Sequence, residues 1–123
     1  MPVTNIRRMS NGTDWPLSVH NREHPGDDKD LPAHYTIDNI AMWIPWCDSE
    51  NDFDAGHYIE VVHRAGSTYI MQSAGHIYYA QRRPVTANWH KMTRDSFEGR
   101  DKVLAISTMN SGHDSIQIYN LQP

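Results

Sequence analysis

The chain has 123 residues, which suits one compact domain spanning 1–123 and leaves no room for two full hydrophobic cores. A hydrophobic fraction of 38% with a charged fraction of 21% indicates a globular chain and argues against disorder. The net charge is −4 and the Lys and Arg residues are scattered, so we expect no nucleic-acid partner and no attraction to anionic lipid.

Two further classes are disfavoured by the composition. No stretch approaches the roughly 20 apolar residues needed to cross a bilayer, and residues 1–10 lack the apolar centre of a signal peptide. We therefore expect a soluble protein, either cytoplasmic or secreted without a cleaved signal peptide. Cys47 is the only cysteine, so an internal disulfide and a cysteine-based metal cage are excluded, and we expect its thiol to be buried.

The N-terminal part of the chain predicts two paired strands and a loop. Residues 3–9 form an extended run, residues 10–14 favour a turn, and residues 15–21 are predicted to be the partner strand. Residues 11–13 also match the N-glycosylation pattern, which is common by chance. Residues 22–32 are polar and contain two prolines, which predicts a long surface loop.

Residues 34–46 alternate between apolar and polar side chains, as a half-buried strand does. The alternation changes parity between Ile37 and Ile40. Because the side chains of a strand repeat every two residues, this change predicts a bulge or bend near Asp38 and Asn39.

The middle of the chain gives the firmest structural prediction. Residues 57–64, 68–73 and 76–81 read as three consecutive strands. The connections at 65–66 and 74–75 are short and contain glycine, which favours tight hairpin turns. We expect these strands to form an antiparallel meander.

The C-terminal part begins with an irregular stretch, 82–100. Within it, residues 88–97 carry three large apolar side chains at spacings that suit one or two helical turns, although an irregular loop fits equally well. Residues 103–109 and 115–120 predict two final strands, joined by hairpin chemistry at 110–113.

About eight short strands at regular spacing, with no long amphipathic helix, predict an all-β fold. The expected architecture is a small antiparallel β-sandwich or jelly-roll-like single domain. We expect Trp15, Trp43 and Trp46 to fill its core, and Trp89, which lies outside the strands, to be exposed.

The acidic run after Trp46 invites a metal hypothesis. Ca²⁺ takes about six to eight oxygen ligands, and calcium loops often place carboxylates at alternate positions. The positions here are Asp48, Glu50, Asp52 and Asp54. The EF-hand pattern fails, because Phe53 stands where glycine is needed and Ile59 where a bidentate glutamate is needed. A solvated loop is the favoured interpretation, and a calcium loop of another type remains an alternative.

Enzymatic signatures are weak. The eight histidines suggest a metal site, but in a strand His57 and His63 would lie about 20 Å apart at roughly 3.3 Å per residue, with Glu60 on the other face. No Gly-x-Ser-x-Gly motif marks a nucleophile. Carboxylate pairs for glycoside hydrolysis can be drawn from the acidic run and Glu60, as from any acidic loop. A metal-dependent jelly-roll enzyme is therefore the last-ranked hypothesis.

The aromatic residues favour a different function. A sugar stacks its C–H face on an aromatic ring and bonds its hydroxyls to Asp, Asn, His or Arg side chains. This mixture occurs at two places, which predict the ligand-binding residues Trp89, Asn88 and His90 at one site and Trp46, Asp48, Asp52, Asp54 and His57 at another.

The favoured hypothesis is a non-catalytic, lectin-like module that binds glycans. Single sugar sites bind weakly and gain from multivalency, so we also predict a homo-oligomer. The main alternative is a toxin component or interaction module that docks on a protein or membrane surface.

Overall fold

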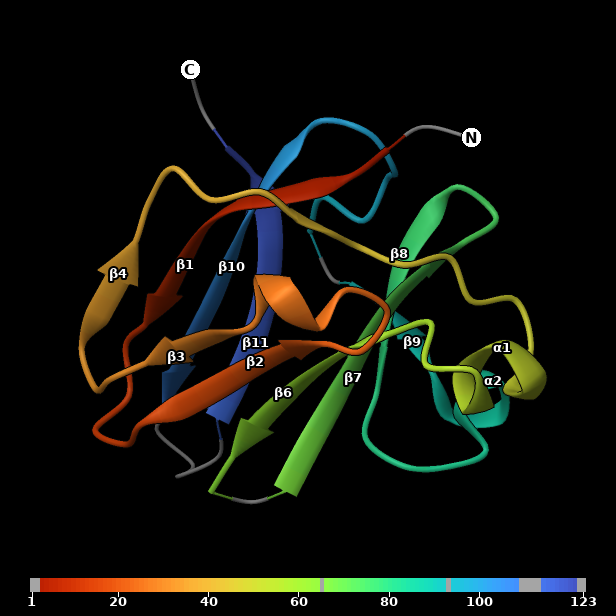
Figure 1. Ribbon diagram of the computed structural model, residues 1–123, viewed down its shortest axis with the longest axis horizontal. Helices are drawn as coiled ribbons and strands as arrows, with labels where there is room; N and C mark the ends of the chain where they lie inside the picture. Colours follow the sequence, from red (N-terminus) through yellow and green to blue (C-terminus); the bar gives the residue numbers. More distant parts are fainter. Residues whose placement is uncertain (1–2, 65, 93, 109–113, 122–123) are drawn as a thin grey trace.

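The computed structural model describes residues 3–64, 66–92, 94–108 and 114–121. Within these segments the chain forms eleven strands, two short α-helices and one 3-10 turn (Figure 1). The prediction of a mostly β protein is confirmed. More strands occur than the eight expected, because several consist of only two or three residues, too few to produce a hydrophobic alternation in the sequence. No helix in the described segments is long and apolar enough to cross a membrane.

Five strands form the first sheet. In spatial order they are β11 (Asp114–Asn120), β10 (Asp101–Thr108), β1 (Asn5–Asn11) and then, side by side along β1, β4 (Tyr35–Ile37) and β5 (Met42–Trp43). β10 and β11 are antiparallel, as predicted, and their connection at 109–113 lies outside the described residues. β1 and β10 run parallel, with Met9 beside Leu104, so the prediction of an entirely antiparallel fold is wrong at this pair.

Six strands form the second sheet, and all neighbouring pairs in it are antiparallel. In spatial order they are β3 (Lys29–Leu31), β2 (Leu17–Asn21), β6 (Ile59–His63), β7 (Gly66–Ser73), β8 (His76–Ala80) and β9 (His90–Lys91). The predicted meander is confirmed as β6, β7 and β8. Ala74 and Gly75 join β7 to β8 with φ angles of 50° and 87°, as a two-residue hairpin turn requires.

The predicted pairing of the first two strands is wrong. β1 lies in the first sheet and β2 in the second, so the connection at 12–16 carries the chain between sheets. Its backbone bonds to distant segments, since Gly12 N donates to Ile106 O over 2.7 Å and Thr13 O accepts from His34 N over 3.2 Å. The short connection favours a hairpin between β1 and β2, but these long-range hydrogen bonds direct the chain to the other sheet.

Two other local predictions also need correction. The expected loop at 22–32 contains the 3-10 turn η1 (Pro25–Asp27) and the edge strand β3. Of the two alternatives for residues 88–97, the helical turns do not form in the described part of this stretch, since α2 (Val85–Asn88) ends where the stretch begins. Pro84 immediately precedes α2, and proline is well suited to the start of a helix but not to its interior.

The break predicted near Asp38 and Asn39 is confirmed. β4 ends at Ile37 and β5 begins at Met42, yet both pair with β1, where only two residues separate the facing positions. The extra residues bulge away from β1, with Asn39 at a φ of 58°.

One hydrophobic cluster takes side chains from both sheets. The first sheet contributes Ile6, Met9, Met42, Leu104, Ile106 and Ile118, and the second contributes Leu17, Val19, Leu31, Ile59, Val61, Ile70 and Ile77. A second cluster consists of Cys47, Phe53, Met71, Ala80 and Val85. Because Ile70 and Met71 are consecutive in β7, their side chains point to opposite faces, so the six-stranded sheet buries apolar groups on both.

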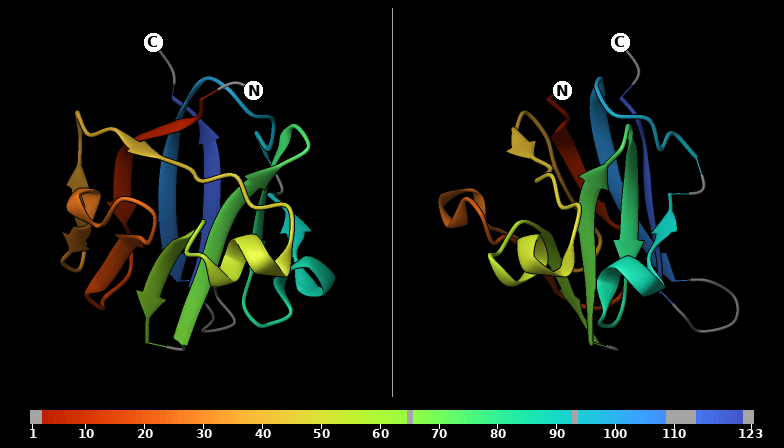
Figure 2. Two further views of the ribbon diagram at one scale, coloured as in Figure 1. Left: turned by 45° about the vertical axis from the view of Figure 1, so that its right-hand side comes forward. Right: turned by 90° about the vertical axis from the view of Figure 1, so that its right-hand side faces the viewer.

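The two helices lie side by side (Figure 2), and each contributes a side chain to this second cluster. Phe53 comes from α1 (Glu50–Asp54) and Val85 from α2. Cys47 is fully buried in the cluster, as predicted.

Trp15, Trp43 and Trp46 do not fill the core as expected, and Trp89, which was expected to be exposed, packs against the second cluster. Trp15 is 44% exposed, and Trp43, Trp46 and Trp89 are half-buried. Isoleucine, leucine, valine and methionine fill the space between the sheets instead. The indole rings are therefore available to line surface pockets.

Candidate ligand-binding sites

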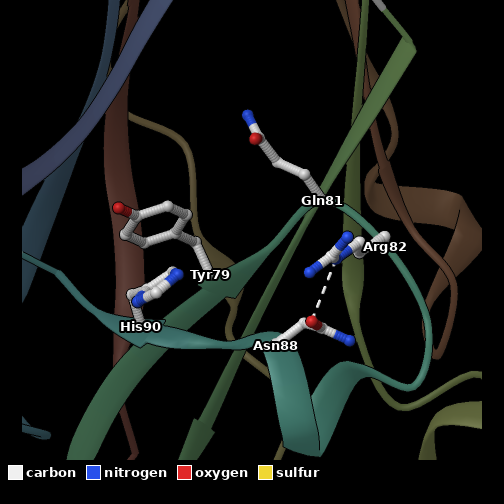
Figure 3. A pocket seen from close by; sticks show the side chains of 5 residues that line it. All are labelled: Tyr79, Gln81, Arg82, Asn88 and His90. Carbon is white, nitrogen blue, oxygen red and sulfur yellow. Dashed lines mark hydrogen bonds between the residues drawn. The ribbon is translucent and has the colours of Figure 1, made fainter.

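The first pocket lies beside the edge of the six-stranded sheet and has a volume of about 320 Å³ (Figure 3). Its lining residues are Tyr79, Gln81, Arg82, Asn88 and His90, and we call it the Tyr79 pocket. Tyr79 in β8 lies directly opposite His90 in β9, with ring centroids 5.6 Å apart and ring planes inclined at 43°. Two of the predicted residues, Asn88 and His90, are thus brought together.

Hydrogen bonds hold the polar side of the Tyr79 pocket in place. Arg82 Nε donates to Asn88 Oδ1 over 2.9 Å, as Figure 3 shows. Asn88 Nδ2 in turn donates to Pro84 O over 2.8 Å, which anchors the amide to α2. Gln81, Arg82 and His90 are exposed, so their polar groups can meet a ligand from solvent.

Trp89, predicted as the platform of this site, does not line the pocket. It stacks on Tyr78, with ring centroids 4.3 Å apart and planes inclined at 20°. Alternation explains this placement, because residues next to each other in an extended segment point to opposite faces. Tyr79 supplies the aromatic surface instead.

The second pocket has a volume of about 330 Å³ and is lined by Val3, His24, Asp27, Trp43 and Trp46. We call it the Trp43 pocket. The Trp43 and Trp46 rings meet edge to face, with centroids 5.0 Å apart and planes at 74°. His24 approaches Trp43 with centroids 5.3 Å apart and planes at 60°. Of the residues predicted for the second site, only Trp46 lies here.

The acidic run forms and anchors α1. Ser49 caps the helix by accepting from Asp52 N over 3.2 Å, and the Asp52 carboxylate accepts from Asp48 N over 2.9 Å. The bond to Ser49 satisfies a backbone donor that a helix N-terminus leaves open, and the bond from Asp48 N ties the residue before the cap to the helix. These carboxylates therefore have a structural role that the sequence prediction of a ligand site missed.

Two carboxylates of the run connect α1 to the segment around α2. Asp54 pairs with Arg83, and Glu50 Oε2 lies 3.7 Å from the same guanidinium. Glu50 Oε1 also accepts from Thr86 N over 3.0 Å. Arg83 in addition lies over the Phe53 ring, with Cζ 5.1 Å from the centroid.

The remaining predicted residues of the second site point to other partners. Asp48 accepts from Ser73 Oγ over 2.5 Å, and His57 Nδ1 lies 2.8 Å from Glu23 Oε1. Among the described residues, no group of three or more His, Cys, Asp or Glu side chains is arranged to hold a metal ion. A calcium loop, the alternative to a solvated loop, stays untested.

Glu60, considered above as a member of a carboxylate pair, is held by neighbours in the second sheet. Ser67 Oγ donates to it over 2.5 Å, and Arg22 donates through Nε over 3.0 Å and through Nη2 over 2.5 Å. Burial acts to raise the pKa of Glu60, but these hydrogen bonds outweigh it and the pKa lies below the usual range. The carboxylate thus stays ionised and paired.

Burial acts in the same direction on the Cys47 thiol, and there its effect on the pKa prevails. Desolvation, reinforced by nearby carboxylates, raises the pKa of Cys47 to about 11, despite a hydrogen bond with the backbone of Ser49 that acts to lower it. A nucleophilic cysteine needs the opposite shift.

Several lining residues escaped prediction. Tyr79 and Gln81 are two residues apart in the predicted strand 76–81. Because side chains of a strand alternate between its faces, this spacing could have suggested that both lie on the same face. His24 and Asp27 lie in the expected polar loop, where nothing in the sequence connects them to Trp43, about twenty residues away.

Comparison with known proteins gives no significant match to any protein-family model, curated protein or solved structure. The function must therefore be inferred from the side chains of the two pockets.

Proposed function

We propose that the protein binds carbohydrate without transforming it, and that the Tyr79 pocket is the binding site. The observation that carries this proposal is the gathering of an amide pair, an imidazole and a guanidinium around one tyrosine ring. A sugar needs both a ring face and converging donors and acceptors, and these five side chains offer that combination.

The dimensions of the pocket support a small ligand. Its volume of about 320 Å³ lies at the lower end of the ~300–1,000 Å³ range of small-molecule sites. One or two sugar units of a longer glycan would occupy it. Arg82 adds a positive charge, which favours glycans with a carboxylate, such as sialic or uronic acids.

The proposed scaffold is a β-sandwich, because one hydrophobic cluster takes side chains from both sheets. A shallow site of this kind binds a single sugar weakly, so the proposal includes a homo-oligomer that presents several sites at once.

A glycan array with labelled protein, run with calcium and repeated with a chelator, tests the proposal. We expect a defined set of bound glycans, enriched in acidic ones. Loss of the signal with chelator would reveal a calcium requirement. A blank array in both conditions would overturn the proposal and favour docking on a protein or membrane surface.

Variants then locate the site. Gln81→Ala and His90→Ala each remove an exposed polar group, and each should weaken binding about five- to tenfold, the value of roughly one hydrogen bond. Lys91→Ala is the matched control, since Lys91 is an exposed neighbour of His90 in β9 that does not line the pocket. Equal affinity of all three variants and the unaltered protein would exclude the Tyr79 pocket.

A further inference from the structure

The Trp43 pocket differs chemically from the Tyr79 pocket. Three aromatic rings line it, and their planes meet at steep angles of 74° and 60°. The Nε1 atoms of Trp43 and Trp46 are buried and bond to no described residue, so the indoles offer a ligand ring surface and not hydrogen-bond donors. This arrangement is poorly suited to the hydroxyl groups of a sugar.

The charge of the Trp43 pocket is negative. Asp27 contributes a carboxylate, and no lysine or arginine appears among the described residues that line it. Aromatic faces carry a negative electrostatic potential, which a carboxylate at the same pocket reinforces.

Buried hydrogen bonds hold the walls of the pocket together before any ligand binds. Asn21, a fully buried side chain, donates through Nδ2 to Trp43 O over 2.8 Å and accepts from His24 N over 3.0 Å. Asp27 N donates to His24 O over 3.0 Å within η1. One amide thus ties the tryptophan wall to the loop that carries the histidine and the carboxylate, which lowers the ordering cost of binding.

We propose that the Trp43 pocket is an aromatic cage for a small quaternary ammonium group, such as that of choline. A trimethylammonium group has no N–H donors, so it needs ring faces and a nearby negative charge more than hydrogen-bond acceptors. The three rings and Asp27 supply these features. This site is independent of the glycan site, because the two pockets share no lining residue.

Titration with choline tests the cage, monitored by calorimetry and by tryptophan fluorescence. We expect a Kd at or below about 1 mM. The neutral isostere 3,3-dimethyl-1-butanol replaces the nitrogen with carbon at nearly the same shape, and it should bind at least tenfold more weakly. Equal binding of the two compounds would overturn the proposal, as would the absence of choline binding at 50 mM, well above that limit.

Two carboxylate variants distinguish a specific contribution of Asp27 to choline binding from the general negative charge of the loop. Asp27→Asn should weaken choline binding at least threefold, whereas Asp30→Asn, which removes a nearby exposed carboxylate outside the pocket, should change it less than twofold. Equal effects of the two would refute a specific role for Asp27. Both changes affect partly or fully exposed side chains, so circular dichroism should show an unchanged fold.

A ring variant tests the aromatic wall. Trp46→Phe keeps an aromatic side chain with a weaker cation interaction, and it should lower choline affinity severalfold while leaving glycan binding at the Tyr79 pocket unchanged. Unchanged choline affinity would contradict the cage.

The same chemistry occurs in free compounds and in phosphatidylcholine headgroups. Sedimentation with phosphatidylcholine vesicles distinguishes the two sources: co-sedimentation that free choline displaces would identify the headgroup, and no co-sedimentation would identify a free compound.

Discussion

Asn11 holds the two sheets together through its buried amide. It ends β1 in the first sheet and is 1% exposed. Its Nδ2 lies 2.8 Å from Trp15 O, 3.0 Å from Leu31 O and 3.1 Å from Pro32 O, and Leu31 belongs to the second sheet. Its Oδ1 accepts from Thr13 N over 2.9 Å and from Thr13 Oγ1 over 2.7 Å.

The substitution Asn11→Asp keeps the shape of this side chain and replaces its donor with an acceptor. The carbonyl groups that face Nδ2 then lose this donor, and the new carboxyl must be buried beside them. An unsatisfied buried group costs about 1–3 kcal/mol, and the substitution removes both N–H donors that the three carbonyls share, so we expect the free energy of unfolding to fall by about 3 kcal/mol. This loss is large beside a typical domain stability of about 5–15 kcal/mol.

Urea denaturation monitored by circular dichroism measures the change, provided that the dependence of the unfolding free energy on urea has the same slope in both proteins. Asn51→Asp is the control, because Asn51 is exposed in α1 and such changes usually stay within about 0.5 kcal/mol. A loss below about 0.5 kcal/mol for Asn11→Asp would refute the role assigned to this amide. The same burial predicts that the folded protein offers no acceptor at residues 11–13, despite their glycosylation pattern.

Two further predictions follow from the ionisable groups. Because the pKa of Glu60 is lowered in the folded protein, its contribution to stability is present above the unfolded pKa of about 4.3 and is lost as the pH falls through the folded pKa. The unfolding free energy should therefore fall more steeply below about pH 5 in the unaltered protein than in Glu60→Gln, and identical pH profiles from urea titrations would contradict this pairing. With a pKa of about 11 and full burial, Cys47 should react with a thiol reagent at pH 8 at least a hundredfold more slowly in the native than in the urea-unfolded protein, and comparable rates would show an accessible thiol.

Local signals predicted the parts of the fold that depend on neighbours in sequence. The meander of β6, β7 and β8 was predictable because short glycine-containing turns join strands of clear alternation. The break after Ile37 was predictable because a change of parity moves side chains to the other face. The pairing of β1 was not, because its neighbour β10 lies some ninety residues away, with the whole six-stranded sheet between them in the chain.

The residues of the pockets were likewise predictable only where they are neighbours in the sequence. Asn88 and His90 were identified from their residue types beside an aromatic residue, and the structure places both in the Tyr79 pocket. Trp89, their neighbour in the sequence, does not join them, because the extended backbone turns it to the opposite face, where it stacks on Tyr78. The predicted ligand-binding role of the acidic run stays a prediction, and the structure adds that its carboxylates serve the cap of α1 and the contacts of α1 with the segment around α2.

The sequence by itself determined a mostly β fold, the two hairpins of the meander and the burial of Cys47, because alternation, turn chemistry and side-chain polarity act over a few residues. Only the tertiary structure decided which strands share a sheet, that the tryptophans lie at the surface, and that His24 and Asp27 meet Trp43 at one pocket. The physical reason is that packing and buried hydrogen bonds such as those of Asn11 and Asn21 join segments far apart in the chain, and no local pattern encodes such contacts.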